Sequence, residues 1–166
     1  MIWKLIAKFV SQPAVTRWLI RRALKTPYSP IIKNGETYME RYWLFNPYDL
    51  TSGKDSRWPS IRLHQILLPD RDRHLHDHPW QCRTIILDGW YTEKRLVYQP
   101  GVLRGAAALF TRRAGDTATL DINDYHSIDT ISKGGVWTMF ITWQYQGTWG
   151  FLVDGKKVPY RKYLGL

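Results

Sequence analysis

The sequence predicts an all-β barrel or sandwich that is preceded by a short helical arm. From about Tyr38 onward, short apolar or alternating runs rich in Ile, Val, Thr, Tyr and Trp are separated by turn residues, with no helical pattern between them. Before that point the apolar residues recur at helical spacing instead. A chain of 166 residues has room for one well-packed domain, so we expect a single globular unit.

The arm, residues 1–28, is expected to form two amphipathic helices. Apolar residues follow the i, i+3, i+4, i+7 template from Ile2 to Val10. Ser11 followed by Pro13 is a helix-start signal, and Val15, Trp18 and Leu19 continue an apolar face.

Most of the net charge of +10 belongs to this arm. Residues 1–35 contain seven Lys or Arg and no acid, which leaves 17 basic and 14 acidic side chains for the rest. Arg17, Arg21 and Lys25 recur every fourth residue, with Arg22 beside them. Two interpretations stay open: the arm packs on the body and solvates its charges, or it binds nucleic acid phosphates or an anionic membrane.

The body, residues 36–166, is expected to consist of short strands. The predicted strands are 42–45, 61–68, 74–78, 82–87, 90–98, 107–112, 117–120, 125–131, 136–143 and 149–153. Cys82 is the single cysteine, which excludes a disulfide-stapled scaffold. No run of about 20 apolar residues suggests a membrane span, so we expect a cytoplasmic protein.

Three of the five histidines, His74, His76 and His78, occupy alternating positions. Residues two apart on a strand point to the same face, so these imidazoles should share one side, with Asp77 on the other. His126 lies in a later predicted strand, and two imidazoles from one segment plus one from another can ligate a metal.

The spacing of these residues resembles the two motifs of the cupin superfamily. His76-Asp77-His78 is followed after three residues by Cys82 and after six more by Gly89, as in the first motif. Gly115 is followed after five residues by Asp121-Ile122-Asn123 and after two more by His126, as in the second. The resemblance covers roughly residues 61–143 and implies a double-stranded β-helix, or jelly-roll, barrel.

The chain departs from these motifs at four positions. Asp70 replaces the leading Gly, Asp121 the Pro and Asn123 the turn Gly, which Asn can mimic because it tolerates positive φ. Cys82 replaces the usual glutamate ligand, so the remaining set of three histidines is similar to that of thiol-dioxygenase-like cupins. The thiol is either a residue beside the metal, as the resemblance implies, or a buried apolar filler.

A narrower resemblance links residues 64–95 to uncharacterised phage and prophage-borne cupin-like proteins. The runs at 135–142 and 149–151, strand residues 41–43 and the basic N-terminus are also similar to theirs. This resemblance implies a fold and a metal site without a substrate, and a host cytoplasm if the chain is phage-encoded.

We predict that His76, His78 and His126 bind a divalent metal ion, Fe, Zn, Ni or Mn. The other expected site residues lie in the outer shell or the pocket: His74, His64, Cys82, Arg62, Thr84, Ile86, Ile128, Thr130 and either Tyr91 or Trp90. Arg62 could bind a carboxylate or phosphate of the substrate, although arginine stems on sheets often only reach to solvent. Asp77 should not complete a two-His-one-carboxylate triad, which weighs against a 2-oxoglutarate oxygenase.

Three functions follow from these residues. The first is a metal-dependent, dioxygenase-like enzyme acting on a small or polymer-borne polar substrate. The second is a non-enzymatic cupin that binds a small ligand, and the third is an interaction protein whose arm (Arg17, Arg21, Arg22, Lys25) binds nucleic acid or membrane. Aromatic residues near Trp143 and Trp149 would also permit a homodimer.

Overall fold

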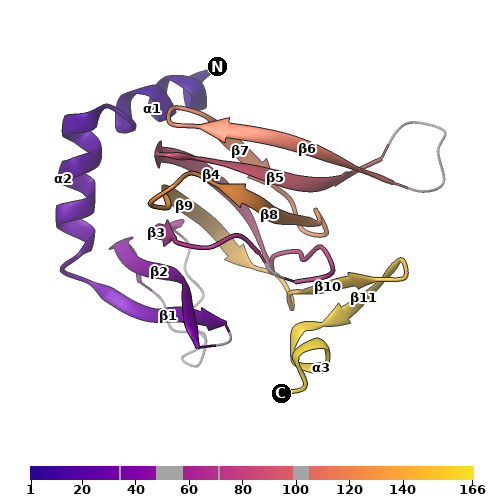
Figure 1. The fold of residues 1–166 in the computed structure, drawn as a ribbon. Coiled ribbons are helices and arrows are strands. Elements are labelled where there is room, and N and C mark those ends of the chain that lie inside the picture. Colours follow the sequence, from indigo (N-terminus) through magenta and orange to yellow (C-terminus); the bar gives the residue numbers. More distant parts are fainter. Residues whose placement is uncertain (34, 48–57, 71, 99–104) are drawn as a thin grey trace.

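The chain folds into two facing antiparallel sheets with two helices on the outside, as the computed structural model shows (Figure 1). The structure describes residues 1–33, 35–47, 58–70, 72–98 and 105–166. The helices are α1 (Ile2–Val10), α2 (Pro13–Ala23) and α3 (Tyr160–Leu164). The strands are β1 (Pro27–Lys33), β2 (Glu36–Phe45), β3 (Ser60–Ile66), β4 (Trp80–Asp88), β5 (Trp90–Val97), β6 (Ala106–Arg113), β7 (Thr117–Leu120), β8 (His126–Ile131), β9 (Val136–Tyr145), β10 (Gly150–Val153) and β11 (Lys156–Pro159).

The larger sheet has the strand order β1-β2-β3-β9-β4-β7, and the smaller has the order β6-β5-β8. Strands distant in sequence become neighbours in the larger sheet, where β9 lies between β3 and β4. Crossing connections of this kind between two antiparallel sheets define a jelly roll, so the predicted all-β jelly-roll fold is confirmed.

Each face of the larger sheet has its own core. On the outer face, Leu63, Ile85, Leu87, Met139 and Ile141 pack under the two N-terminal helices. On the inner face, Ile66, Ile86 and Val136 meet residues of the smaller sheet, including Tyr91 and Ile128. The alternation of side chains along β3, β4 and β9 produces these two layers.

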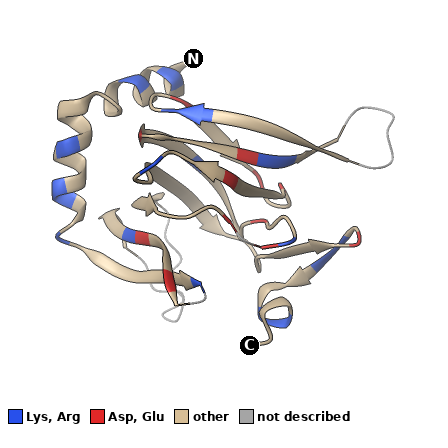
Figure 2. Ribbon diagram, viewed as in Figure 1, with Lys and Arg blue, Asp and Glu red and all other residues tan. Residues whose placement is uncertain are grey.

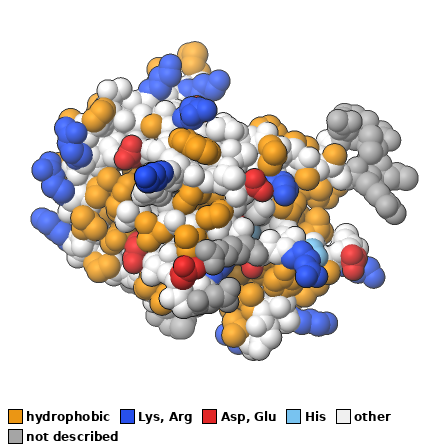
Figure 3. Space-filling view, in the orientation of Figure 1, with side chains coloured by type: hydrophobic (Ala, Val, Ile, Leu, Met, Phe, Trp, Pro, Cys, Tyr) orange, Lys and Arg blue, Asp and Glu red, His pale blue; other side chains and the backbone are white. Residues whose placement is uncertain are grey.

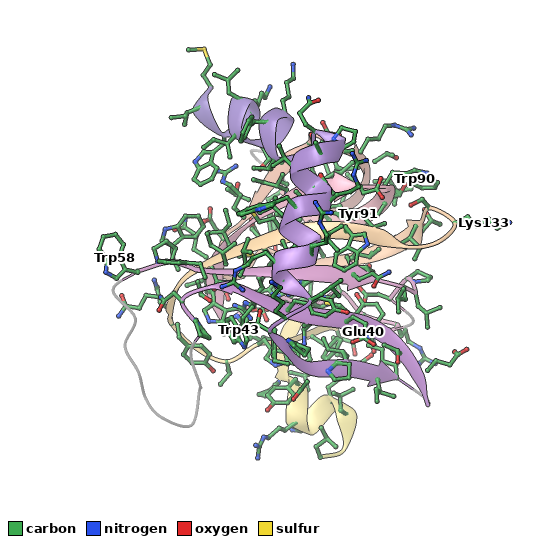
Figure 4. The ribbon with its side chains drawn as sticks, turned by 90° about the vertical axis from the view of Figure 1, so that its left-hand side faces the viewer. Glu40, Trp43, Trp58, Trp90, Tyr91 and Lys133 are labelled. Atoms are coloured by element: carbon green, nitrogen blue, oxygen red, sulfur yellow. The ribbon has the colours of Figure 1, made fainter. Side chains whose placement is uncertain are left out.

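The two N-terminal helices cover the outer face of the larger sheet, and α2 crosses in front of it in Figure 4. Ala7, Leu19 and Ala23 are buried against that face. The buried hydroxyl of Thr16 donates to the carbonyls of Val10 and Leu87, at 2.9 and 3.4 Å, and so ties the helix pair to the end of β4. Within the described residues, no helix combines the length and apolar character needed to cross a bilayer.

The chain differs from the sequence prediction at the junction between the arm and the body. Pro27 and Tyr28, which the prediction assigned to the arm, lie in β1, an edge strand that pairs with β2. This strand was not predicted because it contains Pro27 and Pro30, and proline disfavours a paired strand. An edge position and the register shift between Tyr28 and Ile31 accommodate both prolines.

The predicted strand 74–78 is wrong, because this segment is irregular except for single bridges from His76 to His126 and Phe151. The C-terminal β10–β11 hairpin and α3 pack beside it. The segment therefore lies between the smaller sheet and the hairpin, where its alternate side chains still point to opposite sides.

Candidate metal centre

His76 and His126 are joined by their backbones in an isolated antiparallel bridge. The His76 amide donates to the His126 carbonyl and the His126 amide donates to the His76 carbonyl, both at 2.9 Å. His126 is the first residue of β8, and His78 lies two residues before β4. These two backbone hydrogen bonds hold residues 50 positions apart in one register.

The three imidazoles of His76, His78 and His126 converge, and we call them the histidine cluster. One nitrogen from each ring lies within 4.8 Å of the others, a spacing that permits ligation of one metal ion. The Nε2 atoms of His78 and His126 are 2.9 Å apart. The predicted ligands are thus brought together by two separate stretches of the chain.

The environment favours neutral imidazoles with free lone pairs. Burial lowers the pKa of His76 to about 4, with Asp70 acting against the shift and His126 adding to it. Burial, followed by the charges of His126 and His76, holds the pKa of His78 well below its ordinary value. Neutral imidazole is the form that ligates metals, so His76 and His78 are in their metal-binding form at neutral pH.

The donor set fits a divalent metal ion. The Nδ1 atom of His76 is buried and has no hydrogen-bond partner among the described residues, although such an atom costs free energy when it remains unpaired. Three nitrogen donors suit Fe, Zn, Ni or Mn to different degrees and do not select one of them.

Glu93 forms a second layer behind His126, although it was not among the predicted site residues. Its Oε2 lies 3.3 Å from Nδ1 of His126, and Arg112 donates to its Oε1 at 2.6 Å. Burial acts to raise the pKa of Glu93, but the hydrogen bonds and charges of His126 and Arg112 outweigh it and lower the pKa. Alternation along β5 from the pocket residue Tyr91 would have placed Glu93 on the same face.

Asp70, at the position of the motif's leading glycine, supports the cluster from the other side. Its carboxylate accepts from the Ile128 amide at 2.8 Å and from Lys33 at 3.2 Å. Burial opposes its ionisation, yet the neighbouring His76, Lys33 and Ile128 groups hold its pKa below the ordinary value. An ionised carboxylate therefore lies close to the histidine cluster without belonging to the ligand set.

Asp77 points away from the cluster, as the alternation predicted. Its carboxylate accepts from the Gly150 amide at 2.8 Å and forms an ion pair with Lys157. The side chain is fully buried, so this contact fastens the histidine segment to the β10–β11 hairpin.

The structure separates the other two histidines from the cluster. Nδ1 of His74 lies 3.0 Å from the Tyr163 hydroxyl on α3, outside the ligand group. His64, on β3, is buried and its ring stacks on Phe140 at 5.0 Å. Burial, then the charges of Arg62 and Arg41, hold the pKa of His64 well below its ordinary value.

Cys82 is completely buried between Leu120 and Phe140 and is absent from the ligand group among the described residues. Burial raises the pKa of its thiol to about 12, which removes the thiolate that would bind a metal. This environment supports the apolar-filler interpretation.

Arg62 lies inside the barrel wall rather than at the surface. Its Nη2 donates to Thr142 Oγ1 at 2.8 Å, and its guanidinium lies 4.9 Å from the Trp80 ring and 5.3 Å from the Trp43 ring. Its charge is one of the smaller causes of the lowered pKa of His78, and the guanidinium and the His78 ring lie 5.5 and 5.7 Å from the same Phe140 ring.

Most of the remaining predicted pocket residues face inward, and one does not. Thr84 shares the inner face of β4 with Ile86, while Tyr91 and Ile128 are buried between the sheets. Thr130 is exposed, so its predicted pocket position is wrong. The pairing of β8 with β5 shifts between Thr92 and Glu93, and this irregularity reverses the alternation after Ile128.

The motif turns adopt the conformations that the resemblance requires. Asn123, in the place of a glycine, has φ of 71°, as the prediction for a left-handed turn residue requires. Gly89 has φ of 78°, and a Cβ there would lie 2.8 Å from the Gly135 carbonyl oxygen. A side chain at Gly89 would therefore disturb the turn between β4 and β5.

The predicted anion-binding residues Arg17, Arg21, Arg22 and Lys25 are all exposed. Figure 2 shows basic residues along both N-terminal helices and no acidic residue on either. They lie on the far side of the helices from the sheet and do not reach the histidine cluster.

Similarity of fold to solved proteins agrees with this architecture, whereas no family model and no curated protein matches the sequence. A structure of Bacillus subtilis oxalate decarboxylase aligns with a TM-score of 0.55 and 18% identity over 87% of this chain and 33% of that one. A structure of Fe(II)-HppE with an alternative substrate aligns with a TM-score of 0.51 and 10% identity over 72% of this chain and 57% of that one. Another oxalate decarboxylase structure, reported for its Mn(II) centres, has a TM-score of 0.53 at 19% identity.

One of these neighbours contains Fe(II) and another has Mn(II) centres, and the chain shares their fold, a jelly roll of the cupin type. It spans 33% and 31% of the two oxalate decarboxylase chains and 57% of the HppE chain, so the similarity concerns only part of each neighbour. At this level of identity the likeness establishes the fold alone.

Proposed function

We propose that this chain is a metal-dependent cupin enzyme with one metal ion held by His76, His78 and His126. The observation that carries the proposal is the convergence of one ring nitrogen from each of two half-buried imidazoles (His76, His78) and one buried imidazole (His126) within 4.8 Å. Three neutral ligands leave coordination positions open, as catalytic metal sites require. The proposed chemistry is oxygenase-like, on a small or polymer-borne polar substrate.

The metal would supply either dioxygen activation, if it is iron, or polarisation of a bound oxygen, if it is zinc or nickel. The chain's own contribution begins with Glu93, whose carboxylate accepts a hydrogen bond from Nδ1 of His126. This contact selects the tautomer whose Nε2 lone pair is free. Arg112 holds Glu93 in turn at 2.6 Å, so the orientation of the ring is fixed through two side chains.

Aromatic side chains around the cluster would exclude water from the reacting atoms. The ring of His78 lies 5.7 Å from Phe140, and that of His76 lies 6.4 Å from Trp149 and 6.0 Å from Phe151. Where water is excluded, the electrostatic interaction between a charged side chain and a bound substrate is stronger than it is in water.

Arg62 gives the pocket a preference for anionic substrates in this proposal. It lies 5.5 Å from the ring of Phe140, which also contacts His78. A guanidinium can hold a carboxylate or phosphate with two hydrogen bonds, so we expect the substrate to carry one of these groups.

The test combines metal identification with oxygen uptake. Protein purified without added metal should contain a divalent ion, and small carboxylates should then accelerate oxygen consumption. A bound metal with no turnover of any carboxylate or phosphate would instead favour a ligand-binding cupin. An Arg62→Lys variant should raise KM for an active carboxylate more than it lowers kcat, because Lys cannot bind bidentately.

A further inference from the structure

The outward surface of the N-terminal helices combines positive charge with large exposed apolar side chains. The exposed cations on these helices and at their end are Lys4, Lys8, Arg17, Arg21, Arg22 and Lys25. Residues 1–35 contain no acid to neutralise them. Figure 3 shows blue and orange side chains together over α1 and blue ones along α2.

α1 is apolar on two sides, although one side would suffice for packing. Toward the sheet it buries Ala7 and packs Trp3, Ile6 and Val10. Away from the sheet, Ile2, Leu5 and Phe9 are 67, 63 and 64% exposed. Their i, i+3, i+7 spacing places them in one strip along the helix.

The exposed strip lies next to cations rather than next to acids. Lys4 and Lys8 flank it on α1, and α2 adds Trp18, 59% exposed, beside Arg17. Aromatic and aliphatic groups next to Lys and Arg are the composition of helices that lie in the interface of anionic bilayers. A helix needs about 20 residues to span a bilayer, and α1 has nine. On a membrane, α1 would therefore lie in the plane of the surface.

We propose that the outward faces of α1 and α2 dock this chain on an anionic lipid bilayer. Ile2, Leu5 and Phe9 enter the boundary between headgroups and acyl chains, and the cations contact lipid phosphates or carboxylates. The inference is independent of the proposed metal chemistry, because these helices lie outside the barrel.

Two other partners fit the surface less well. Nucleic acid phosphates would match the cations but would leave three large apolar side chains in water. A second copy of this chain could cover the strip, but it would bring an equal set of cations against the first. An anionic bilayer satisfies both features at once.

The patch is preformed, because the inner faces of both helices are fixed to the sheet through Ala7, Leu19 and Ala23. Deletion of the helices would uncover that core, so the test uses exposed positions in the full chain. The measurement is cosedimentation with vesicles of phosphatidylcholine containing about one third phosphatidylglycerol, compared with pure phosphatidylcholine, at low and high salt.

The apolar component is tested with Leu5→Asn and Phe9→Asn. Each variant should reduce partitioning into anionic vesicles by about 10-fold, because one large apolar side chain no longer enters the bilayer. The matched control is Ile32→Asn, since Ile32 is 61% exposed on β1, at the opposite end of the molecule from α1 (Figure 1). That variant should bind as the original protein does.

The charge component is tested by replacing Arg17, Arg21 and Lys25 with Gln. The triple variant should bind anionic vesicles at least 10-fold more weakly, and raised salt should weaken the original protein in the same direction. The control replaces three exposed lysines outside the helices with Gln, which changes the net charge by the same amount. These lysines are Lys133, Lys156 and Lys162.

Three results would overturn the proposal. The first is binding of the Leu5→Asn and Phe9→Asn variants to anionic vesicles that is as tight as that of the original protein. The second is binding of a DNA duplex by the original protein with no binding of vesicles. The third is a dimer in solution that these two substitutions convert to a monomer, with no lipid binding.

Discussion

The two faces of the larger sheet use their residues for different purposes. On β3, β4 and β9 the outer face presents Leu63, Ile85, Leu87, Met139 and Ile141, all aliphatic or thioether side chains under the helices. The inner face of the same strands presents Arg62, His64, Cys82, Thr138 and Thr142, five buried residues with polar or ionisable groups. The outer face provides stability, and the inner face accepts polar groups that a purely structural core would exclude.

The largest stability effect should come from the outer face. Leu63 is fully buried there, so Leu63→Ala should lower the free energy of unfolding by about 2–5 kcal/mol through lost burial and a residual cavity. Thr84→Ala on the inner face should cost less than about 1 kcal/mol, since Thr84 is half-buried. Chemical denaturation measures both, and equal losses would remove the distinction between the faces.

The Glu93→Gln variant tests whether Glu93 contributes to metal affinity. An amide of the same shape accepts a weaker hydrogen bond from His126, so metal affinity should fall by about 10–100-fold. Competition with a chelator of known affinity measures this change. Glu40→Gln, a half-buried acid on β2, is the matched control, and a similar loss of affinity there would contradict a specific role for Glu93.

Thr16→Val tests the attachment of the helices to the sheet. The variant removes the hydroxyl that donates to Val10 and Leu87 while it keeps the volume, so unfolding should cost about 1 kcal/mol less. The metal content of the protein should not change, because this contact lies on the outer side of the sheet. A loss of metal in Thr16→Val would mean that the two faces are coupled.

The smallest effect is expected from treating the native protein with a thiol reagent, because Cys82 is buried. Its pKa of about 12 and complete burial should leave the thiol unreactive toward iodoacetamide in the native protein at pH 8. Mass spectrometry should show alkylation only after unfolding. Rapid alkylation of the native protein would contradict the apolar-filler interpretation, because it would show that the thiol is accessible to reagent.

Motif spacing was sufficient to predict the histidine cluster, because its ligands lie at short, fixed distances from turns. Asn123 and Gly89 adopt positive φ in those turns. Both residue types favour such turns, so the turn positions can be predicted from the sequence. Spacing does not require regular structure, so the convergence of His76 and His78 with His126 could be predicted even though their segment is not a strand.

Features that depend on strand register could not be predicted in the same way. Glu93 meets His126 only because β5 pairs with β8, and no local pattern specifies that pairing. The predicted pocket position of Thr130 is wrong for a related reason. An irregularity in the β5–β8 pair reverses the inward and outward alternation of the β8 side chains. β1 was missed because its two prolines are tolerated only at an edge, and edge position is a property of the folded sheet.

The central claim is that imidazoles from two segments hold one metal ion, and metal content per chain tests it most directly. We expect near-stoichiometric divalent metal in the original protein and in His74→Ala, and almost none in His76→Ala or His126→Ala, with all four proteins folded by circular dichroism. Equal metal content in all four, or equal loss from the three variants, would contradict the assignment of the ligands.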